Sequence, residues 1–201
     1  MIPDLNDSEL KVATKLIFEG LSMAKASMEQ ILQSPINIEQ IEYGSSDMDI
    51  DRFGGNESEV HVIKTELLGE LKGTSHLIFS EQEVKKLYES SLPKKIVEDD
   101  SKESTIMKLG FLTEIDNMVS AAVITEFSNF LGVEIYGNVP SLKVIKAKEI
   151  NDYLQEESSD LEQIIHFKAV FEGKELDISP DFIWVFHNKF VDKIKALVAE
   201  K

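Results

Sequence analysis

The sequence predicts an α+β fold: a mixed, largely antiparallel sheet with two long helices packed on one face. Apolar residues recur at helical spacing over residues 8–33 and again over about 105–131. Short segments with strand patterns lie between and after these helices, and several turn at glycines. The order of elements in residues 8–92 resembles that in residues 103–200. We therefore interpret residues 1–201 as one internally duplicated domain, since each half alone would bury little apolar surface.

The first half opens with a helix. Its apolar positions fall on one face and are Leu10, Ala13, Ile17, Leu21, Ala24, Met28 and Ile31. Ser8 is the expected N-cap, without a capping box, and Pro35 ends the helix. The segment INIEQIEY, residues 36–43, alternates apolar and polar residues as a half-buried strand does.

Two more strands are expected at Val60–Leu68 and Lys72–Phe79, with a turn near Gly69. A short amphipathic helix follows, for which Ser80 is the N-cap and Glu83 completes a capping box. Residues 93–104 are rich in charge and are expected to form a linker.

The second half repeats this plan after its long helix. The expected elements are extended structure around Pro140, a short helix over 148–157, two strands within 161–186 turning near Gly173, and a closing amphipathic helix over 187–201. An offset of 99 residues places Ile17 on Asp116 and Leu32 on Leu131. The sequence identity between the halves is weak, so the interpretation of an internal duplication rests on the matching order of elements.

The composition argues against several classes of function. The net charge is −16, whereas nucleic acid and anionic membranes select clustered Lys and Arg. No apolar run approaches the roughly 20 residues that cross a bilayer, and the N-terminal residues lack the pattern of a secretory signal. There is no cysteine to form disulfides or thiolate metal sites. We expect a cytoplasmic protein without membrane insertion or nucleic-acid binding.

The second long helix carries Glu114 and Asn117 three residues apart, which places a carboxylate and a carboxamide on one face. Pro140 follows Asn117 after 22 intervening residues. Taken alone, a Glu-x-x-Asn pair is most simply a solvated turn of a helix. The spacing to the proline and the surrounding residues favour a functional interpretation.

These features resemble the CheC/CheX/FliY phosphatase family of bacterial chemotaxis. The resemblance rests on Glu114, Asn117 and Pro140, on the small residues after the Asn, on NFLGVEI and VPSLKVI, and on GELKGTSHLIFS. It covers nearly the whole chain and includes the duplicated, CheC-like fold. One position departs from the family pattern, because Gly110 stands where the family has Asp or Ser.

The resemblance implies a phosphatase that acts on the aspartyl phosphate of a CheY-like response-regulator receiver. Asn117 would hold the attacking water in line with phosphorus, and Glu114 would contact the lysine of the receiver. Mg²⁺ would arrive with the receiver, so no cofactor is expected on the chain itself. A CheD-like regulator is a further candidate partner, and both a monomer and a homodimer stay open.

The first half lacks a matching site. In the ungapped register Glu114 falls on Lys15 and Asn117 on Phe18, and we expect Phe18 to be a core residue. The first helix is therefore expected to be structural, leaving one working site. The missing first site and Gly110 keep a second hypothesis open, namely a non-catalytic adaptor that binds a receiver or a motor-switch protein.

Other polar groups give weaker patterns. Residues 47–53 carry alternating aspartates, but Arg52 and Ser58 occupy positions where a calcium loop has Gly and Glu, so a solvated loop is favoured. The four histidines show no ligand spacing, and Trp184 alternates along a strand as a core residue. We expect no metal site.

Overall fold

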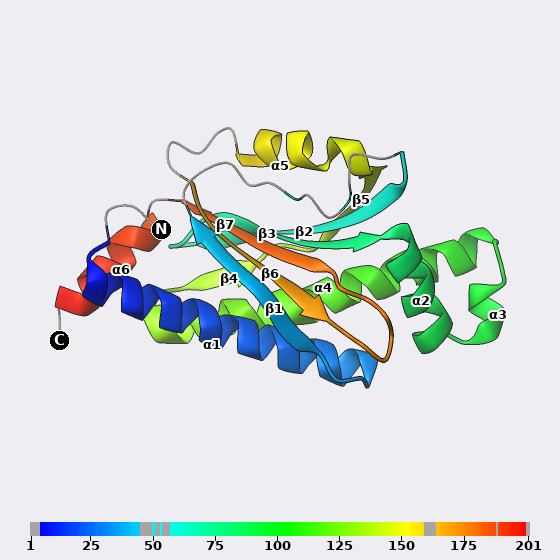
Figure 1. The fold of residues 1–201 in the computed structure, drawn as a ribbon, viewed down its shortest axis with the longest axis horizontal. Coiled ribbons are helices and arrows are strands. Elements are labelled where there is room, and N and C mark those ends of the chain that lie inside the picture. The colour runs from blue at the N-terminus through cyan, green and yellow to red at the C-terminus, as the bar shows by residue number, and fades with distance from the viewer. Residues whose placement is uncertain are drawn as a thin grey trace.

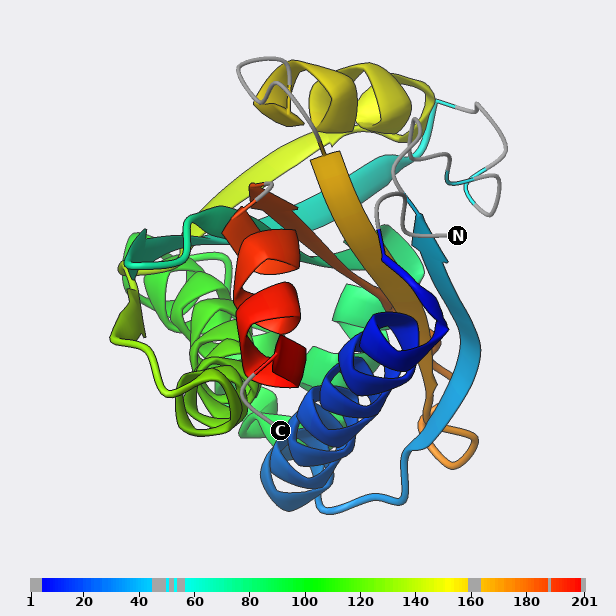
Figure 2. The ribbon, with the colours of Figure 1, turned by 90° about the vertical axis from the view of Figure 1, so that its left-hand side faces the viewer.

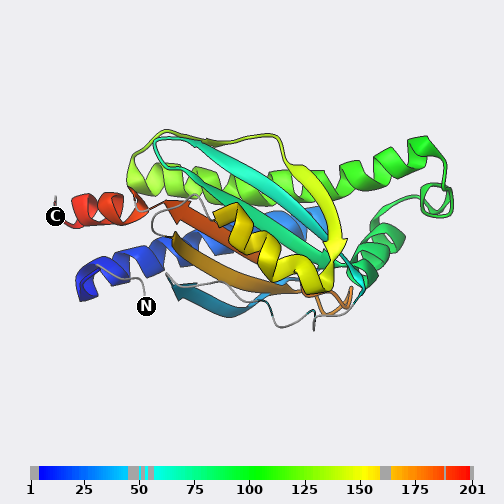
Figure 3. The same ribbon diagram turned by 90° about the horizontal axis from the view of Figure 1, so that it is seen from above.

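A seven-stranded sheet separates two layers of helices (Figures 1 and 2). The computed structural model describes residues 5–44, 50, 53, 57–158, 164–187 and 189–199. The two long helices, α1 (Asp7–Leu32) and α4 (Lys102–Leu131), lie side by side on one face of the sheet. The shorter α5 (Ile150–Ser158) covers part of the opposite face, as the view from above shows (Figure 3). This arrangement confirms the predicted α+β class and the placement of both long helices.

The remaining elements lie close to their predicted positions. The other helices are α2 (Glu81–Ser91), α3 (Lys94–Val97), the short 3₁₀ helix η2 (Ala147–Glu149) and α6 (Lys189–Ala199). The strands are β1 (Asn37–Gly44), β2 (Glu59–Gly69), β3 (Gly73–Ser80), β4 (Ile135–Gly137), β5 (Ser141–Lys146), β6 (Ile164–Glu172) and β7 (Asp181–His187).

Strands from the two halves of the chain are interleaved in the sheet, with β6 and β7 of the second half lying between β1 and β3 of the first. The order is β1-β6-β7-β3-β2-β4, and β5 also pairs with β2. All strand pairs in the described part of the chain are antiparallel. Because β1 pairs with β6 and β3 with β7, neither half forms a sheet by itself. The division of residues 1–201 into two repeats stays a prediction.

The main core lies between the sheet and the two long helices. Its centre is a group of stacked and tilted rings, all fully or almost fully buried: Phe127, Phe167, Trp184, Phe186 and Phe190. Trp184 is thus a core residue, as its alternation along the strand predicted. A smaller core on the other face packs Ile150 and Leu154 of α5 against β2, β3 and β7.

Two predictions of local secondary structure are wrong. The N-cap of α1 is Asn6 instead of Ser8, and Asn6 forms a complete capping box with Glu9. The segment 93–104 is more than a linker, because it contains α3 and the start of α4, which is capped by Ser101. The short α3 has no buried residue and therefore no apolar period by which the sequence could reveal it.

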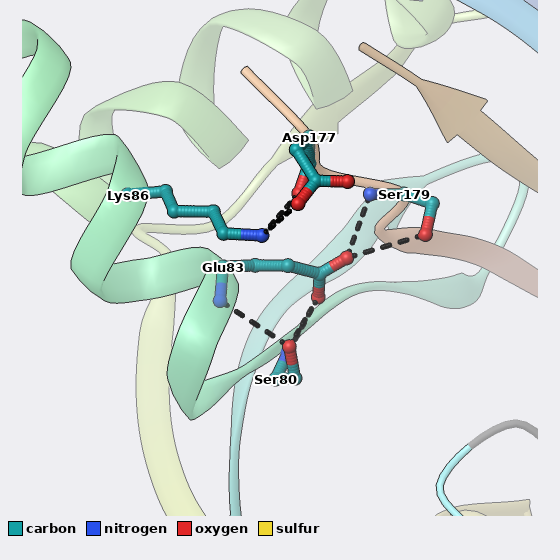
Figure 4. Close-up of polar contacts among 5 residues, drawn as sticks. All are labelled: Ser80, Glu83, Lys86, Asp177 and Ser179. Carbon is teal, nitrogen blue, oxygen red and sulfur yellow. Dashed lines mark hydrogen bonds and ion pairs between the residues drawn. The ribbon is translucent and has the colours of Figure 1, made fainter. Parts of the chain in front are cut away.

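The predicted cap of α2 is confirmed and also joins distant parts of the chain (Figure 4). Glu83 accepts hydrogen bonds from the backbone and hydroxyl of Ser80 through one carboxylate oxygen, at 2.7 and 2.8 Å. Its other oxygen accepts from the backbone N–H of Ser179 at 2.6 Å. Lys86, one turn along, pairs with Asp177. The start of α2 is thereby fixed to the connection between β6 and β7.

Two helical glycines have opposite surroundings, which gives a stability prediction. A Cβ at Gly20 would lie 2.6 Å from the buried ring of Phe127, whereas a Cβ at Gly110 would meet nothing within 4 Å. We expect Gly20→Ala to lower the free energy of unfolding by about 1–3 kcal/mol, since the helices cannot separate without opening the core. Gly110→Ala should raise it by about 0.5–1 kcal/mol through helix propensity alone. Urea denaturation of both variants tests this, and a Gly20→Ala variant as stable as Gly110→Ala would contradict it.

Candidate functional site

Glu114 and Asn117 lie one turn apart on the exposed side of α4. The residues between them, Ile115 and Asp116, point inward and are fully buried. Neither Glu114 nor Asn117 has a hydrogen-bond or ion-pair partner among the described residues. The helix therefore presents a free carboxylate and a free carboxamide from a packed, rigid element, as the spacing predicted.

The same side of α4 is apolar toward its N-terminus. Ile106 and Met107 are 60% and 56% exposed, and both precede Gly110 on the face that carries Glu114 and Asn117. This end of α4 extends past the sheet toward α3 (Figure 1). Gly110 is exposed, so the site offers no side chain at the position where the family pattern has Asp or Ser.

A pocket of about 270 Å³ opens beside Asn117, between α4 and the edge of the sheet. Its lining comes from α4, β2 and β4 together with the residue that follows β4: Thr65, Asn117, Ser120, Ala121, Ile124, Thr125, Ile135, Tyr136, Gly137 and Asn138. Most of its polar groups are hydroxyls and carboxamides. The pocket is thus a neutral, hydrogen-bonding recess next to the candidate residue.

Pro140 lies in the connection between β4 and β5, close in the chain to this pocket. Asn138 of the same connection donates its backbone N–H to the carbonyl of Glu66 on β2 at 2.8 Å. The Asn138 side chain accepts from the backbone N–H of Val139 at 2.9 Å. The proline stands where β4 gives way to β5, and its missing N–H suits a position between two strands.

Behind Asn117, Asp116 is completely buried among hydroxyl groups. Thr65 of β2 donates to one carboxylate oxygen at 2.6 Å, and Ser120 donates to the other at 3.2 Å. The hydroxyls of Ser120 and Ser75 are 3.0 Å apart. Burial raises the pKa of Asp116 to about 7, against the lowering effect of the hydrogen bonds from Thr65 and Ser120. We refer to Thr65, Ser75, Asp116 and Ser120 as the Asp116 cluster.

The equivalent face of α1 differs from the prediction at Phe18. The side chain is 56% exposed instead of buried, because the core face of α1 passes through Leu16, Ile17 and Gly20. Phe18 lines an open groove together with Lys15 and with Tyr43 of β1. The residues that align with Glu114 and Asn117 are thus accessible, but they offer a cation and an apolar ring.

The described residues contain no group of three or more His, Asp or Glu side chains placed to hold a metal ion. The aspartates of residues 47–53 that suggested a calcium loop lie outside the described residues. His76 is fully buried, and desolvation lowers its pKa to about 3, so it stays neutral. Within the same described part of the chain, no helix has the length and apolar character needed to cross a membrane.

The arrangement of helices and sheet is that of several solved chemotaxis proteins. FliY from Thermotoga maritima superposes with a TM-score of 0.68 at 17% sequence identity, covering 98% of this chain and 99% of FliY. The chain has the CheC/CheX/FliY fold. CheX from Borrelia burgdorferi, crystallised with CheY, BeF₃ and Mg²⁺, gives a TM-score of 0.59 at 12% identity over 85% of this chain and 97% of that one.

The middle domain of FliM from Vibrio alginolyticus shares the CheC/CheX/FliY fold as well, with a TM-score of 0.55 at 15% identity over 92% of this chain and 99% of that domain. No protein-family model and no curated protein sequence matches the chain. The likeness is therefore one of architecture, and it spans 85–98% of this chain in the three structures compared.

Sequence reasoning found the exposed pair but missed Asp116. A signal was present in the repeat alignment, because the offset of 99 places Asp116 on Ile17, a buried residue of α1. A carboxylate at a position that is apolar and buried in the other long helix indicates a buried polar contact. The alignment did not show which strand residues would provide its partners.

Proposed function

We propose that this chain accelerates the hydrolysis of aspartyl phosphate in a CheY-like receiver domain. The observation that carries the proposal is the placement of Glu114 and Asn117. Both are exposed on one face of a helix whose opposite face is buried, and neither side chain has a partner among the described residues. The Borrelia burgdorferi structure of CheX with CheY, BeF₃ and Mg²⁺ supports a receiver as the partner for this fold.

In the proposed mechanism, the carboxamide of Asn117 holds one water molecule in line with the phosphorus. A carboxamide both donates and accepts hydrogen bonds, so it can orient water without the charge by which a carboxylate would repel phosphoryl oxygens. The receiver supplies the phosphorylated aspartate and the Mg²⁺ bound to it, as part of the substrate. Catalysis by this chain is then mostly positioning, for which a helix anchored in a core is well suited.

Glu114 contributes affinity in this proposal. Its carboxylate would form a charge-assisted hydrogen bond with the lysine of the receiver, which sets the approach of α4. Ile106 and Met107 extend the contact surface along the same helix face and would lose their exposure on binding. Because Gly110 has no side chain and nothing lies within 4 Å of a Cβ at that position, the receiver can approach the backbone of α4 closely there.

Glu114→Gln tests this assignment. We expect the KM for the phosphorylated receiver to rise about tenfold, the value of one charge-assisted hydrogen bond, with a smaller change in kcat. Glu149→Gln is the matched control, because Glu149 is also an exposed glutamate but lies in η2, which packs on the opposite face of the sheet from α4. The rate of phosphate loss is measured against the concentration of receiver. Equal KM values for both variants would remove Glu114 from the interface.

A receiver-binding adaptor without turnover is the second candidate. The departure at Gly110 favours it, and so does the likeness to the middle domain of FliM. This function would use the same face of α4 for binding alone. Binding of the phosphorylated receiver without faster loss of phosphate would support it.

A further inference from the structure

The Asp116 cluster is a polar contact inside an otherwise apolar interface between α4 and the sheet. Thr65 and Ser75 are direct partners in the β2–β3 register and point to the face that α4 covers. Around them the interface consists of residues such as Leu67, Leu77 and Val123, all at most 2% exposed. Apolar packing is non-directional, whereas hydrogen bonds depend on distance and angle. The cluster is therefore the part of this interface that constrains the rotation of α4.

This cluster reaches the candidate site directly. Thr65 and Ser120 line the pocket that Asn117 also lines, and Asp116 immediately precedes Asn117 in the helix. The 2.6 Å hydrogen bond from Thr65 to Asp116 thus fixes α4 to β2 at the level of Asn117. A small rotation of the helix about its axis would break this bond and move the Asn117 carboxamide at the same time.

Helix α1 shows that the sheet does not require such a cluster to hold a long helix. The offset of 99 places Asp116 and Ser120 on Ile17 and Leu21, both buried and aliphatic. In that helix, Lys15 and Phe18 replace the Glu and Asn. The polar contact accompanies the helix that carries the candidate pair, although burying a carboxylate costs stability that an aliphatic side chain would not.

We propose that Asp116 is a positioning residue, whose hydrogen bond with Thr65 sets the rotation of α4 so that Asn117 holds the attacking water in line. The inference rests on the proposed phosphatase function. Asp116 acts through Asn117 and touches neither the receiver nor the water. Because a displacement of about 1 Å can cost roughly 100-fold in rate, losing this contact should affect kcat more than KM.

The test uses variants that separate position from stability. Thr65→Val combined with Asp116→Leu replaces both partners by apolar groups of similar shape, which is close to neutral for stability. We expect kcat for phosphate loss to fall about 10- to 100-fold, with KM within threefold of wild type. Asp116→Asn keeps an acceptor for the Thr65 hydroxyl and should retain kcat within threefold.

Ser104→Ala is the matched control, since it removes a hydrogen bond from another buried residue of α4, that between Ser104 and Asp99. It should lower stability and leave kcat within twofold. A folded Thr65→Val/Asp116→Leu variant with the kcat of wild type would overturn the proposal, and so would an equal loss of kcat in Ser104→Ala. If wild type binds the receiver without hastening phosphate loss, the proposed function fails. Hydrogen exchange of the backbone amides of residues 113–121 then tests whether the Thr65–Asp116 hydrogen bond holds α4 in place on β2. Faster exchange in the double variant supports this role of the bond, and unchanged exchange overturns it.

Discussion

Asn117→Ala is expected to lower kcat for phosphate loss from the receiver by about 100-fold or more, with little change in stability. The expected loss of kcat follows from the role proposed for the carboxamide, since removing one group that positions a reacting atom lowers the rate by about 10²–10³-fold. Stability should be preserved because the side chain is exposed and has no partner among the described residues. Single-turnover decay of the phosphorylated receiver measures kcat, and urea denaturation measures stability.

Asn129→Ala is the control for this experiment. Asn129 is another exposed asparagine of α4, three turns beyond Asn117 and away from the pocket. It should keep the kcat of wild type. Asn117→Asp adds a second arm, since a carboxylate of the same shape should also inactivate the site by repelling the phosphoryl group. Unfolding of Asn117→Ala, or full activity of Asn117→Asp, would contradict the assigned role.

The second large effect concerns stability and its dependence on pH. Burial raises the pKa of Asp116 from an ordinary value of 3.8 to about 7, and no ionised side chain of the described residues counters this effect. Between about pH 4 and 7 the unfolded chain is ionised at this position while the folded chain stays protonated. The folded state then binds one proton more, so Asp116 lowers the free energy of unfolding by about 1.4 kcal/mol for each pH unit across this window.

Asp116→Asn removes this ionisation and keeps the hydrogen-bonding shape. We expect its advantage in free energy of unfolding over wild type to grow by about 2–4 kcal/mol from pH 4 to pH 7 and to level off above that. The remaining carboxylates of this acidic chain are common to both proteins and cancel in the difference. Urea denaturation at pH 4.5, 6 and 7.5 gives the comparison. A difference that does not change with pH would mean that Asp116 titrates normally in the folded protein.

The parts of the fold that the sequence predicted correctly are those with a local physical cause. The period of apolar residues defines α1 and α4, and the pair Ser80 and Glu83 defines the start of α2. Glu114 and Asn117 lie on one exposed face of α4, as their spacing predicted, whereas their functional role came from the family resemblance and stays a proposal. The order of the strands had no such local cause, since the pairing of β1 with β6 joins residues more than a hundred positions apart.

The errors at Phe18 and Asp116 arose because tertiary packing decides which side chains are buried. Phe18 lies next to Ile17 at the edge of the apolar stripe of α1, and only the position of the sheet determines which of the two is buried. Asp116 is a polar residue at a core position. Its partner Thr65 lies on β2, and Ser75, which bonds with its other partner Ser120, lies on β3, so both contacts come from strands distant in sequence. The buried acid became visible as part of the site only once α4 was placed on β2 and β3.

The measurement that tests the central claim most directly is phosphate loss from receiver domains of the same organism, with Mg²⁺ present and this protein at substoichiometric concentration. We predict that a receiver loses its phosphate faster than it does alone, over several turnovers, and that Asn117→Ala abolishes the acceleration while Asn129→Ala does not. Binding of the phosphorylated receivers with no acceleration of phosphate loss across the set would contradict the phosphatase function and support the adaptor.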